Sequence, residues 1–189
     1  VGKALNAFGE SDVDTQGAPY SATNNVNLAR GTFTIWAKPK GGFDVGDDWN
    51  YFLSVATASG VEIINIYAAP DGTHARVIDA SGAAHDAIAS NKPQVTGGPW
   101  WSAGGWTMIA VTWDSMTGTV RVYVDGAKAG DLTGAAFAMA TIAKTMWVGR
   151  EVSTATGAHS AESRLDRARV YDGVLSSGQI QLLYQGEKP

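Results

Sequence analysis

The chain has 189 residues, of which 44% are apolar and 17% charged, and its formal net charge is -4 at pH 7. This composition excludes a disordered polyelectrolyte and predicts one globular domain over residues 1–189. The acidic balance without a basic stripe argues against nucleic acid as a partner. The absence of cysteine excludes disulfides and thiolate metal sites, and no apolar run approaches the roughly 20 residues of a membrane span.

Most segments between turn signals alternate apolar and polar residues, which is the pattern of β-strands. We predict strands over residues 3–8, 32–38, 50–56, 61–68, 74–79, 106–114, 119–125, 145–150 and 163–171. Turn residues separate them, and Asp125-Gly126 favours a tight hairpin. Strands at this density without intervening helices predict an all-β fold, an antiparallel two-sheet jelly-roll β-sandwich with about six strands in each sheet.

One short C-terminal helix is predicted to begin near Ser176. Ser176 and Gln179 have the spacing of a capping box, and Ile180, Leu183 and Tyr184 follow at helical spacing. The predicted core consists of Phe33, Ile35, Leu53, Val55, Ile64, Ile66, Ile109, Val111, Val120, Val122, Val124, Val148 and Val170. Because a rigid sandwich displays function on its loops, we expect ligands at the loops over residues 9–29, 41–49, 91–105 and 153–162.

Four motifs follow one another along the chain in the order of a known family of β-sandwiches. Residues 31–40 read G-T-F-T-I-W-A-K-P-K, an alternating strand with a central Trp that ends in Lys-Pro. Residues 106–126 begin with Trp and end in the hairpin sequence Y-V-D-G, and residues 146–149 read M-W-V-G. A final strand over 165–171 and a helix over 175–184 complete the order. The chain thereby resembles the laminin-G-like, concanavalin A-type lectin/glucanase superfamily, which implies a jelly-roll sandwich.

A calcium site is one expectation that this resemblance raises. Family members often carry an Asp directly after the Phe of the first strand, whereas here a glycine and then Glu10 occupy these positions. In the final strand, Asp166 alternates with Ala168 and Val170, so we expect it on the inward face, where a carboxylate needs a partner. One interpretation is a structural Ca²⁺ site formed by Asp166, Glu10 and Asp12. The alternative is an Asp that accepts backbone N–H groups or pairs with Arg.

Aromatic residues in and beside the loops form the candidate ligand site. Trp100 and Trp101 lie in T-G-G-P-W-W-S-A-G-G, which has no strand periodicity, whereas most other Trp residues lie in strand patterns. With Trp49 and Tyr51, they offer flat rings on which a sugar can stack. The alternative is that these rings close the ends of the sandwich or contact another protein, since large aromatic side chains are mostly buried.

Acidic residues lie next to this candidate site in the sequence. Asp44, Asp47 and Asp48 cluster in the loop that leads to the first of the aromatic residues. Such carboxylates accept hydrogen bonds from sugar hydroxyls or bind calcium, although a solvated loop has the same composition and the spacing is not that of an EF-hand. We interpret the adjacent His85 and Asp86 as a surface pair.

Catalytic motifs of the related enzymes are missing. Family glucanases carry E-x-D-x-(x)-E on one strand, and here Asp12 and Asp14 have no third partner. The motifs of alginate-lyase-like members are absent as well. His74, His85 and His159 lie in different segments without zinc spacing, and there is neither a G-x-S-x-G elbow nor a cysteine nucleophile. We predict that the protein is not an enzyme.

The sequence therefore predicts a non-catalytic recognition module that binds glycan on a cell or particle surface. Its predicted contacts are Trp49, Tyr51, Trp100, Trp101, Asp44, Asp47 and Asp48. The alternative is a structural or assembly protein, such as a decoration or fibre domain of a virion, that contacts neighbouring subunits through the same rings. Residues 38–53, with Lys-Pro, a Gly/Asp-rich loop and W-N-Y-F-L, are similar to versions in phage structural proteins. The recognition hypothesis and the assembly hypothesis both predict an extracellular or virion-surface location, and both are compatible with an oligomer.

Overall fold

The computed structural model describes residues 11–12, 17–39, 49–69, 71–90, 105–139, 143–151, 163–187 and 189. Within these residues the chain forms twelve strands and one helix. Their bounds are β1 (Ser11–Asp12), β2 (Ala18–Ser21), β3 (Arg30–Pro39), β4 (Asn50–Ala56), β5 (Glu62–Ala69), β6 (Gly72–Ile78), β7 (Ala84–Ala89), β8 (Thr107–Asp114), β9 (Thr119–Val124), β10 (Ala127–Thr133), β11 (Thr145–Val148), β12 (Ser163–Tyr171) and α1 (Ser177–Glu187).

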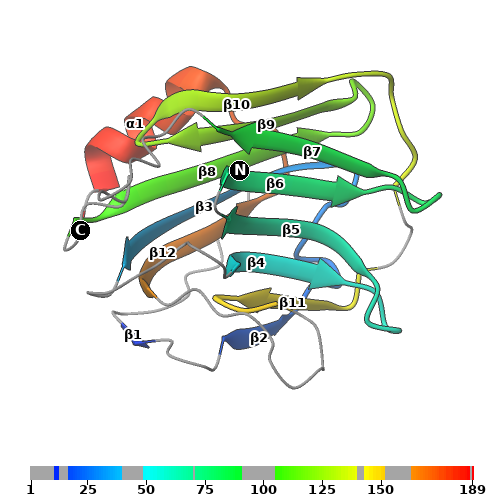
Figure 1. Cartoon of the computed structure of the whole chain (residues 1–189), viewed down its shortest axis with the longest axis horizontal. Coiled ribbons are helices and arrows are strands. Elements are labelled where there is room, and N and C mark those ends of the chain that lie inside the picture. Colours follow the sequence, from blue (N-terminus) through cyan, green and yellow to red (C-terminus); the bar gives the residue numbers. More distant parts are fainter. Residues whose placement is uncertain are drawn as a thin grey trace.

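The described strands form two antiparallel six-stranded sheets that pack into a sandwich (Figure 1). One sheet, here the helix-side sheet, has the order β1-β12-β3-β8-β9-β10. The other, here the open-side sheet, has the order β2-β11-β4-β5-β6-β7. Strands from both ends of the sequence are therefore neighbours, as β3 and β12 are. This arrangement confirms the predicted all-β, two-sheet jelly roll with one short C-terminal helix.

Strand prediction succeeded where alternation is strong. β4 and β12 have the predicted bounds, and the other predicted strands on described residues differ from them by a few residues at most. The predicted strand over 3–8 lies outside the described residues. Alternation does not predict β1, β2, β7 and β10. The last two are rich in Ala and polar residues, which have low strand propensity, and they form because hairpins pair them with β6 and β9.

The hairpin between β9 and β10 has the turn that its sequence predicts. Asp125 and Gly126 both adopt positive φ, 49° and 80°, as a two-residue type I′ turn requires. The Asp125 carboxylate also accepts a hydrogen bond from the Met108 N–H at 2.9 Å. The turn is thus tied to the neighbouring strand β8.

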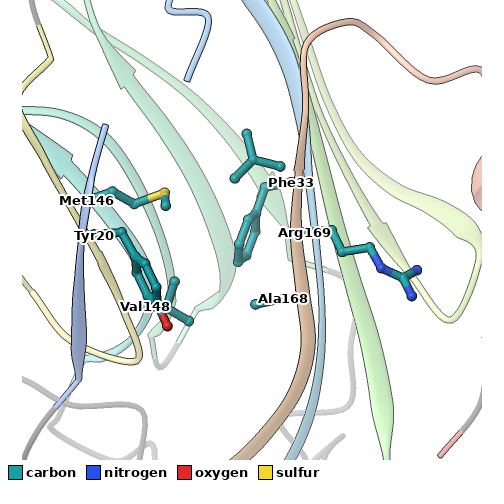
Figure 2. A pocket seen from close by; sticks show the side chains of 7 residues that line it. Tyr20, Phe33, Met146, Val148, Ala168 and Arg169 are labelled. Atoms are coloured by element: carbon teal, nitrogen blue, oxygen red, sulfur yellow. The ribbon is translucent and has the colours of Figure 1, made fainter. Parts of the chain in front are cut away.

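Near the edge formed by β2, β11 and β12, the two sheets leave a small gap between their inner faces. Figure 2 shows Tyr20 and Met146 of the open-side sheet facing Phe33 of the helix-side sheet. The cavity has a volume of about 10 Å³. Arg169 also borders it, but its side chain points away from the cavity (Figure 2). This cavity holds at most about one water molecule, so it is not a ligand site.

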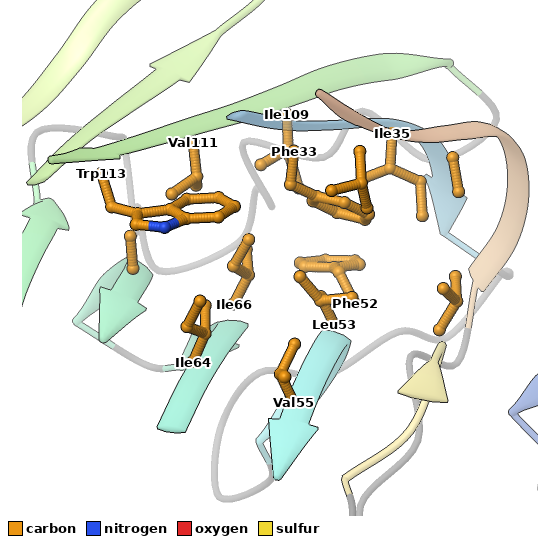
Figure 3. Close-up of a cluster of buried hydrophobic side chains, with 14 of the residues drawn as sticks. Phe33, Ile35, Phe52, Leu53, Val55, Ile64, Ile66, Ile109, Val111 and Trp113 are labelled. Atoms are coloured by element: carbon orange, nitrogen blue, oxygen red, sulfur yellow. The ribbon is translucent and has the colours of Figure 1, made fainter. Parts of the chain in front are cut away.

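The core between the sheets contains the residues that the alternation predicts. Figure 3 shows side chains of β3 and β8 pointing toward side chains of β4 and β5. All the predicted core residues belong to this cluster, and Val124 alone among them is only partly buried. Burying one such side chain stabilises the fold by about 1.5–3 kcal/mol.

The sandwich is closed on one side by close backbone contact between its edge strands β7 and β10. A Cβ atom on Gly130 of β10 would lie 2.6 Å from the carbonyl carbon and oxygen of Ile88 in β7. Real side chains do not tolerate this distance, so only glycine fits. The inward residues of β7, Ala87 and Ala89, are small and buried, which lets the sheets converge here.

The outer face of the helix-side sheet is apolar and is covered by α1. Trp36 stacks on Tyr184 of the helix with ring centroids 5.7 Å apart, and Ile180 is fully buried against the same face. The predicted capping box is present, since the Ser176 N–H donates to the Gln179 side chain at 2.8 Å. Among the described residues, no helix has the length and apolarity needed to cross a membrane.

Gly31 offers a test of the core. It lies opposite Trp113 in the β3–β8 ladder, and an added Cβ would lie 2.3 Å from the buried indole ring. We expect Gly31→Ala to lower the free energy of unfolding by roughly 1–3 kcal/mol through overpacking, measured by urea denaturation. Gly173→Ala is the matched control, because its added methyl meets nothing within 4 Å. Equal losses in the two variants would contradict this account.

Candidate functional site

A row of aromatic rings crosses the outer face of the open-side sheet. Tyr51, Tyr67 and His74 are directly opposite one another on β4, β5 and β6. The Tyr67 ring centroid lies 5.1 Å from that of Tyr51 and 4.7 Å from that of His74. Because successive strand residues point to opposite faces, Ile66 points into the core while Tyr67 points outward. Cross-strand rings on one face therefore stack.

Trp49, directly before β4, extends this row toward solvent. Its ring stacks on Tyr67 with centroids 5.2 Å apart and planes within 9°, and it lies 6.5 Å from Tyr51. Trp49 is 39% exposed, whereas Tyr51 is only 2% exposed. The structure thus brings these two predicted residues together, with Trp49 as the ring that reaches the surface. We call Trp49, Tyr51, Tyr67 and His74 the aromatic row.

Beside the aromatic row lies a polar row, which consists of Ser54, Asn65, Arg76 and Asp86 from β4 to β7. The Ser54 hydroxyl donates to the Asn65 carbonyl oxygen at 2.8 Å. Nε and Nη2 of Arg76 both donate to Oδ2 of Asp86, at 3.1 and 2.9 Å. The Arg76 guanidinium also lies 5.5 Å from the Tyr67 ring centroid. This contact joins the two rows.

His74 lies between two carboxylates. Its Nε2 is 2.8 Å from Oδ1 of Asp71, and its Nδ1 is 3.3 Å from both oxygens of Asp86. Both ring nitrogens donate only in the cationic imidazolium, so this geometry matches the protonated form. Burial lowers the pKa of His74, but the hydrogen bonds to Asp86 and Asp71 outweigh it, so the pKa lies above its ordinary value.

Burial raises the pKa of three other ionisable groups on this face. It is the main cause that raises the pKa of Tyr51 and of Tyr67, so both phenols keep their protons. Burial also raises the pKa of Glu62, whose carboxylate accepts hydrogen bonds from the Asn65 amide at 2.5 Å and the Ser54 hydroxyl at 3.3 Å. These groups are suited to donating and accepting hydrogen bonds.

All the other predicted glycan-binding residues lie outside the described residues. These are Asp44, Asp47, Asp48, Trp100 and Trp101, and their roles stay predictions. Glu10 lies outside as well. For Asp12, the structure describes the backbone in β1, which pairs with Arg164 of β12. β1 is therefore the strand next to the one that carries Asp166.

The predicted inward orientation of Asp166 is wrong. β12 has a bulge between Asp166 and Arg169, where Arg167 adopts φ 51°. The extra residue reverses the alternation, so Leu165 and Ala168 point into the core and Asp166 lies opposite the outward Trp36.

Asp166 is 17% exposed and has local partners. Its Oδ1 accepts the backbone N–H of Arg167 at 2.7 Å, and its Oδ2 lies 3.6 Å from the Arg167 guanidinium. These contacts match the alternative prediction, in which Asp166 accepts a backbone N–H group or pairs with Arg and is not a calcium ligand. Within the described part of the chain, no three His, Asp or Glu side chains are grouped to hold a metal ion. Calcium binding by Asp166, Glu10 and Asp12 stays a prediction.

Sequence reasoning missed most of the two rows. The interpretation of His85 and Asp86 as one surface pair is wrong, because Asp86 binds Arg76 and His74, whereas His85 binds Asp79 at 3.0 Å. A usable signal was present: β5 and β6 place polar or aromatic residues at alternate positions (Asn65, Tyr67, His74 and Arg76) between buried apolar ones.

Comparisons with known proteins agree with this fold. The sequence matches the concanavalin A-like lectin/glucanases superfamily over residues 14–181. No curated protein is similar enough in sequence to count as a match.

Similar solved structures are binding domains of botulinum neurotoxins. The receptor-binding domain of botulinum neurotoxin D has 11% identity and a TM-score of 0.63, with 97% of this chain and 41% of that chain covered. The serotype D ligand-binding domain in complex with N-acetylneuraminic acid has 13% identity and a TM-score of 0.61 over 84% and 36%. The binding domain of botulinum neurotoxin DC in complex with SialylT has 9% identity and a TM-score of 0.64, with 84% of this chain and 35% of that chain covered. The chain spans well under half of each, and these likenesses show the fold alone.

His74 makes stability depend on pH. Because its pKa is higher in the folded than in the unfolded chain, its stabilising contribution is complete below about pH 6.5 and is lost as pH rises through the folded pKa. We expect His74→Gln to lower the free energy of unfolding by roughly 1–3 kcal/mol at low pH and to remove this fall. Urea denaturation across pH measures both.

His85→Gln is the control for this experiment, because His85 binds Asp79 and stacks on Phe137, apart from the two rows. In the His85→Gln variant, the free energy of unfolding should still fall as pH rises from the unfolded to the folded pKa of His74. A His74→Gln variant with the same pH profile as the unmodified chain would contradict the assignment.

Proposed function

The chain belongs to the concanavalin A-like lectin/glucanases superfamily, and we propose that it is a non-catalytic module that recognises glycans. The binding face is the outer face of the open-side sheet, around the aromatic and polar rows. Trp100, Trp101, Asp44, Asp47 and Asp48 remain part of this proposal. The last three lie within the five residues that precede Trp49 in the sequence.

The observation that carries the proposal is the ring of Trp49. It is 39% exposed and is stacked at 5.2 Å on a second ring, Tyr67. An indole held in a fixed orientation offers apolar area on which the C–H face of a sugar ring can stack, at little cost in side-chain entropy.

The polar row supplies the second requirement of sugar recognition, which is a fixed set of donors and acceptors. The Arg76 guanidinium and the carboxylates of Asp86 and Asp71 lie on the same face as the Trp49 ring and are partly exposed, whereas Asn65 is buried. Arg76 contacts Tyr67, on which Trp49 stacks, so stacking and hydrogen-bonding groups are neighbours. Ligand sites in proteins combine apolar area with a few positioned polar groups.

The solved neighbours support a binding role in a general way. Two of them are complexes, one with N-acetylneuraminic acid and one with SialylT. Because this chain covers 36% and 35% of those chains, the likeness does not assign those sugars to the matched part. It agrees with a sandwich that serves recognition.

Binding without catalysis is supported by how the ionisable groups are used. Asp86 is bonded to Arg76 and His74. The raised pKa values of Tyr51 and Tyr67 keep both phenols protonated at neutral pH, so neither is available as a general base. Glycoside hydrolysis needs two carboxylates that flank one bond. On the described part of this face, Asp86 and Asp71 are bonded to His74, and Glu62 is bonded to Asn65 and Ser54. Appearance of new reducing ends or unsaturated products from any bound polysaccharide would overturn this part of the proposal.

Trp49→Ala is the direct test of the site. We expect glycan affinity to fall by at least about tenfold, because truncation of a stacking aromatic anchor costs roughly 2 kcal/mol or more. Titration calorimetry on a polysaccharide panel, with Trp fluorescence as a second signal, measures the change. Trp100→Ala and Trp101→Ala test the loop residues in the same assay.

Met116→Ala is the matched control, since Met116 is 77% exposed and lies in the turn between β8 and β9. It should bind as the unmodified chain does. If no glycan binds and the chain associates with itself on concentration, the assembly alternative gains support: an extracellular or virion-surface structural domain whose Trp49 region contacts a neighbouring subunit.

A further inference from the structure

We propose that this face selects uncharged glycans and discriminates against acidic ones. The inference rests on the proposed function and names the class of ligand that the two rows would take. It comes from the charges on the face and from the partners that each charge already has.

The cations next to the aromatic row are already matched. Arg76 directs two of its N–H groups to one oxygen of Asp86. His74 lies between Asp71 and Asp86. An acidic sugar binds through a cation that it can neutralise, usually by a bidentate contact with Arg. Here the charge of Arg76 is already compensated by Asp86, so an acidic sugar that contacts the remaining N–H groups of Arg76 meets the Asp86 carboxylate beside them.

Carboxylates also outnumber cations on the described part of this face. Four carboxylates contribute, which are Glu62, Asp71, Asp86 and Glu151. Three cations oppose them, which are Arg76, Arg150 and protonated His74. Arg150 lies over the Trp147 ring at 5.3 Å.

The carboxylates lie where they would act on a ligand bound at Trp49. Asp71 is bonded to His74 of the aromatic row while its side chain is 64% exposed. The charge of Glu151 raises the pKa of Tyr51, after burial, and that of Glu62, so it acts across the same face. A ligand carboxylate or sulfate placed on Trp49 would meet like charges, which disfavour binding. Sugar hydroxyls donate to carboxylates and accept from guanidinium groups, so an uncharged glycan satisfies both.

The test compares pairs of glycans that share a backbone and differ in charge. Suitable probes are lactose and sialyllactose, dextran and dextran sulfate, and methyl-esterified and free polygalacturonate. For any pair that binds, we expect the uncharged member to bind at least about tenfold more tightly. Its affinity should stay within about twofold between about 50 and about 500 mM NaCl, because no ion pair forms with the ligand.

Variants change the charge without removing the rings. Asp71→Asn, at an exposed carboxylate, and Asp86→Asn, which frees Arg76, should each shift the preference toward the acidic member by about threefold to tenfold. Asp71→Asn keeps the test valid if Asp86→Asn does not fold. Asp131→Asn is the matched control: it removes a carboxylate that binds Arg121 and Lys128 on the helix-side sheet and should leave the preference unchanged.

The outcomes separate this inference from the proposed function. Binding that depends on Trp49 but favours the acidic member of a pair overturns the inference and leaves the function standing. No binding by any member of any pair overturns the proposed function and the inference with it. Preference for the uncharged member, with loss of binding in Trp49→Ala, supports both.

Discussion

The inward apolar faces of the two sheets leave water only by packing on each other, and this contact organises the whole molecule. Side chains of β3 and β8 meet those of β4 and β5 in one cluster. The helix-side sheet carries a second apolar surface on its outer face, around Trp36 and Met108, and this surface needs a cover of its own. The helix α1 provides that cover, whereas the outer face of the open-side sheet carries the aromatic and polar rows, of which Trp49 and Arg76 are partly exposed.

The aromatic and polar rows owe their geometry to the sheet beneath them. Neighbouring strands lie about 4.8 Å apart, close to the 4.7 and 5.1 Å that separate the ring centroids of His74, Tyr67 and Tyr51. The polar groups bind one another, as Arg76 and Asp86 do, which holds each side chain in one orientation. A face ordered in this way before a ligand arrives loses little conformational entropy on binding.

Local patterns failed in informative places. Alternation along β12 places Asp166 inward, but a bulge at Arg167 turns it outward. Nothing in the sequence of β12 marks the bulge, because it depends on pairing with β3. The sequence predicts the candidate site only in part: Trp49 and Tyr51 are candidate ligand residues from the sequence, whereas Tyr67, His74 and Arg76 look like ordinary outward residues of separate strands. They become one site only when β4, β5 and β6 pair.

The sequence by itself determined the features that depend on neighbouring residues. These are the alternation that separates core from surface, the Asp125-Gly126 turn, and the Ser176 cap of the helix. The tertiary structure alone decided the order of strands in each sheet, the bulge that reorients Asp166, the stacking of Trp36 under α1, and the two rows on the open-side sheet. The reason is physical: these features arise from hydrogen bonds and packing between segments far apart in the chain, and local periodicity does not specify which distant segment a strand will meet.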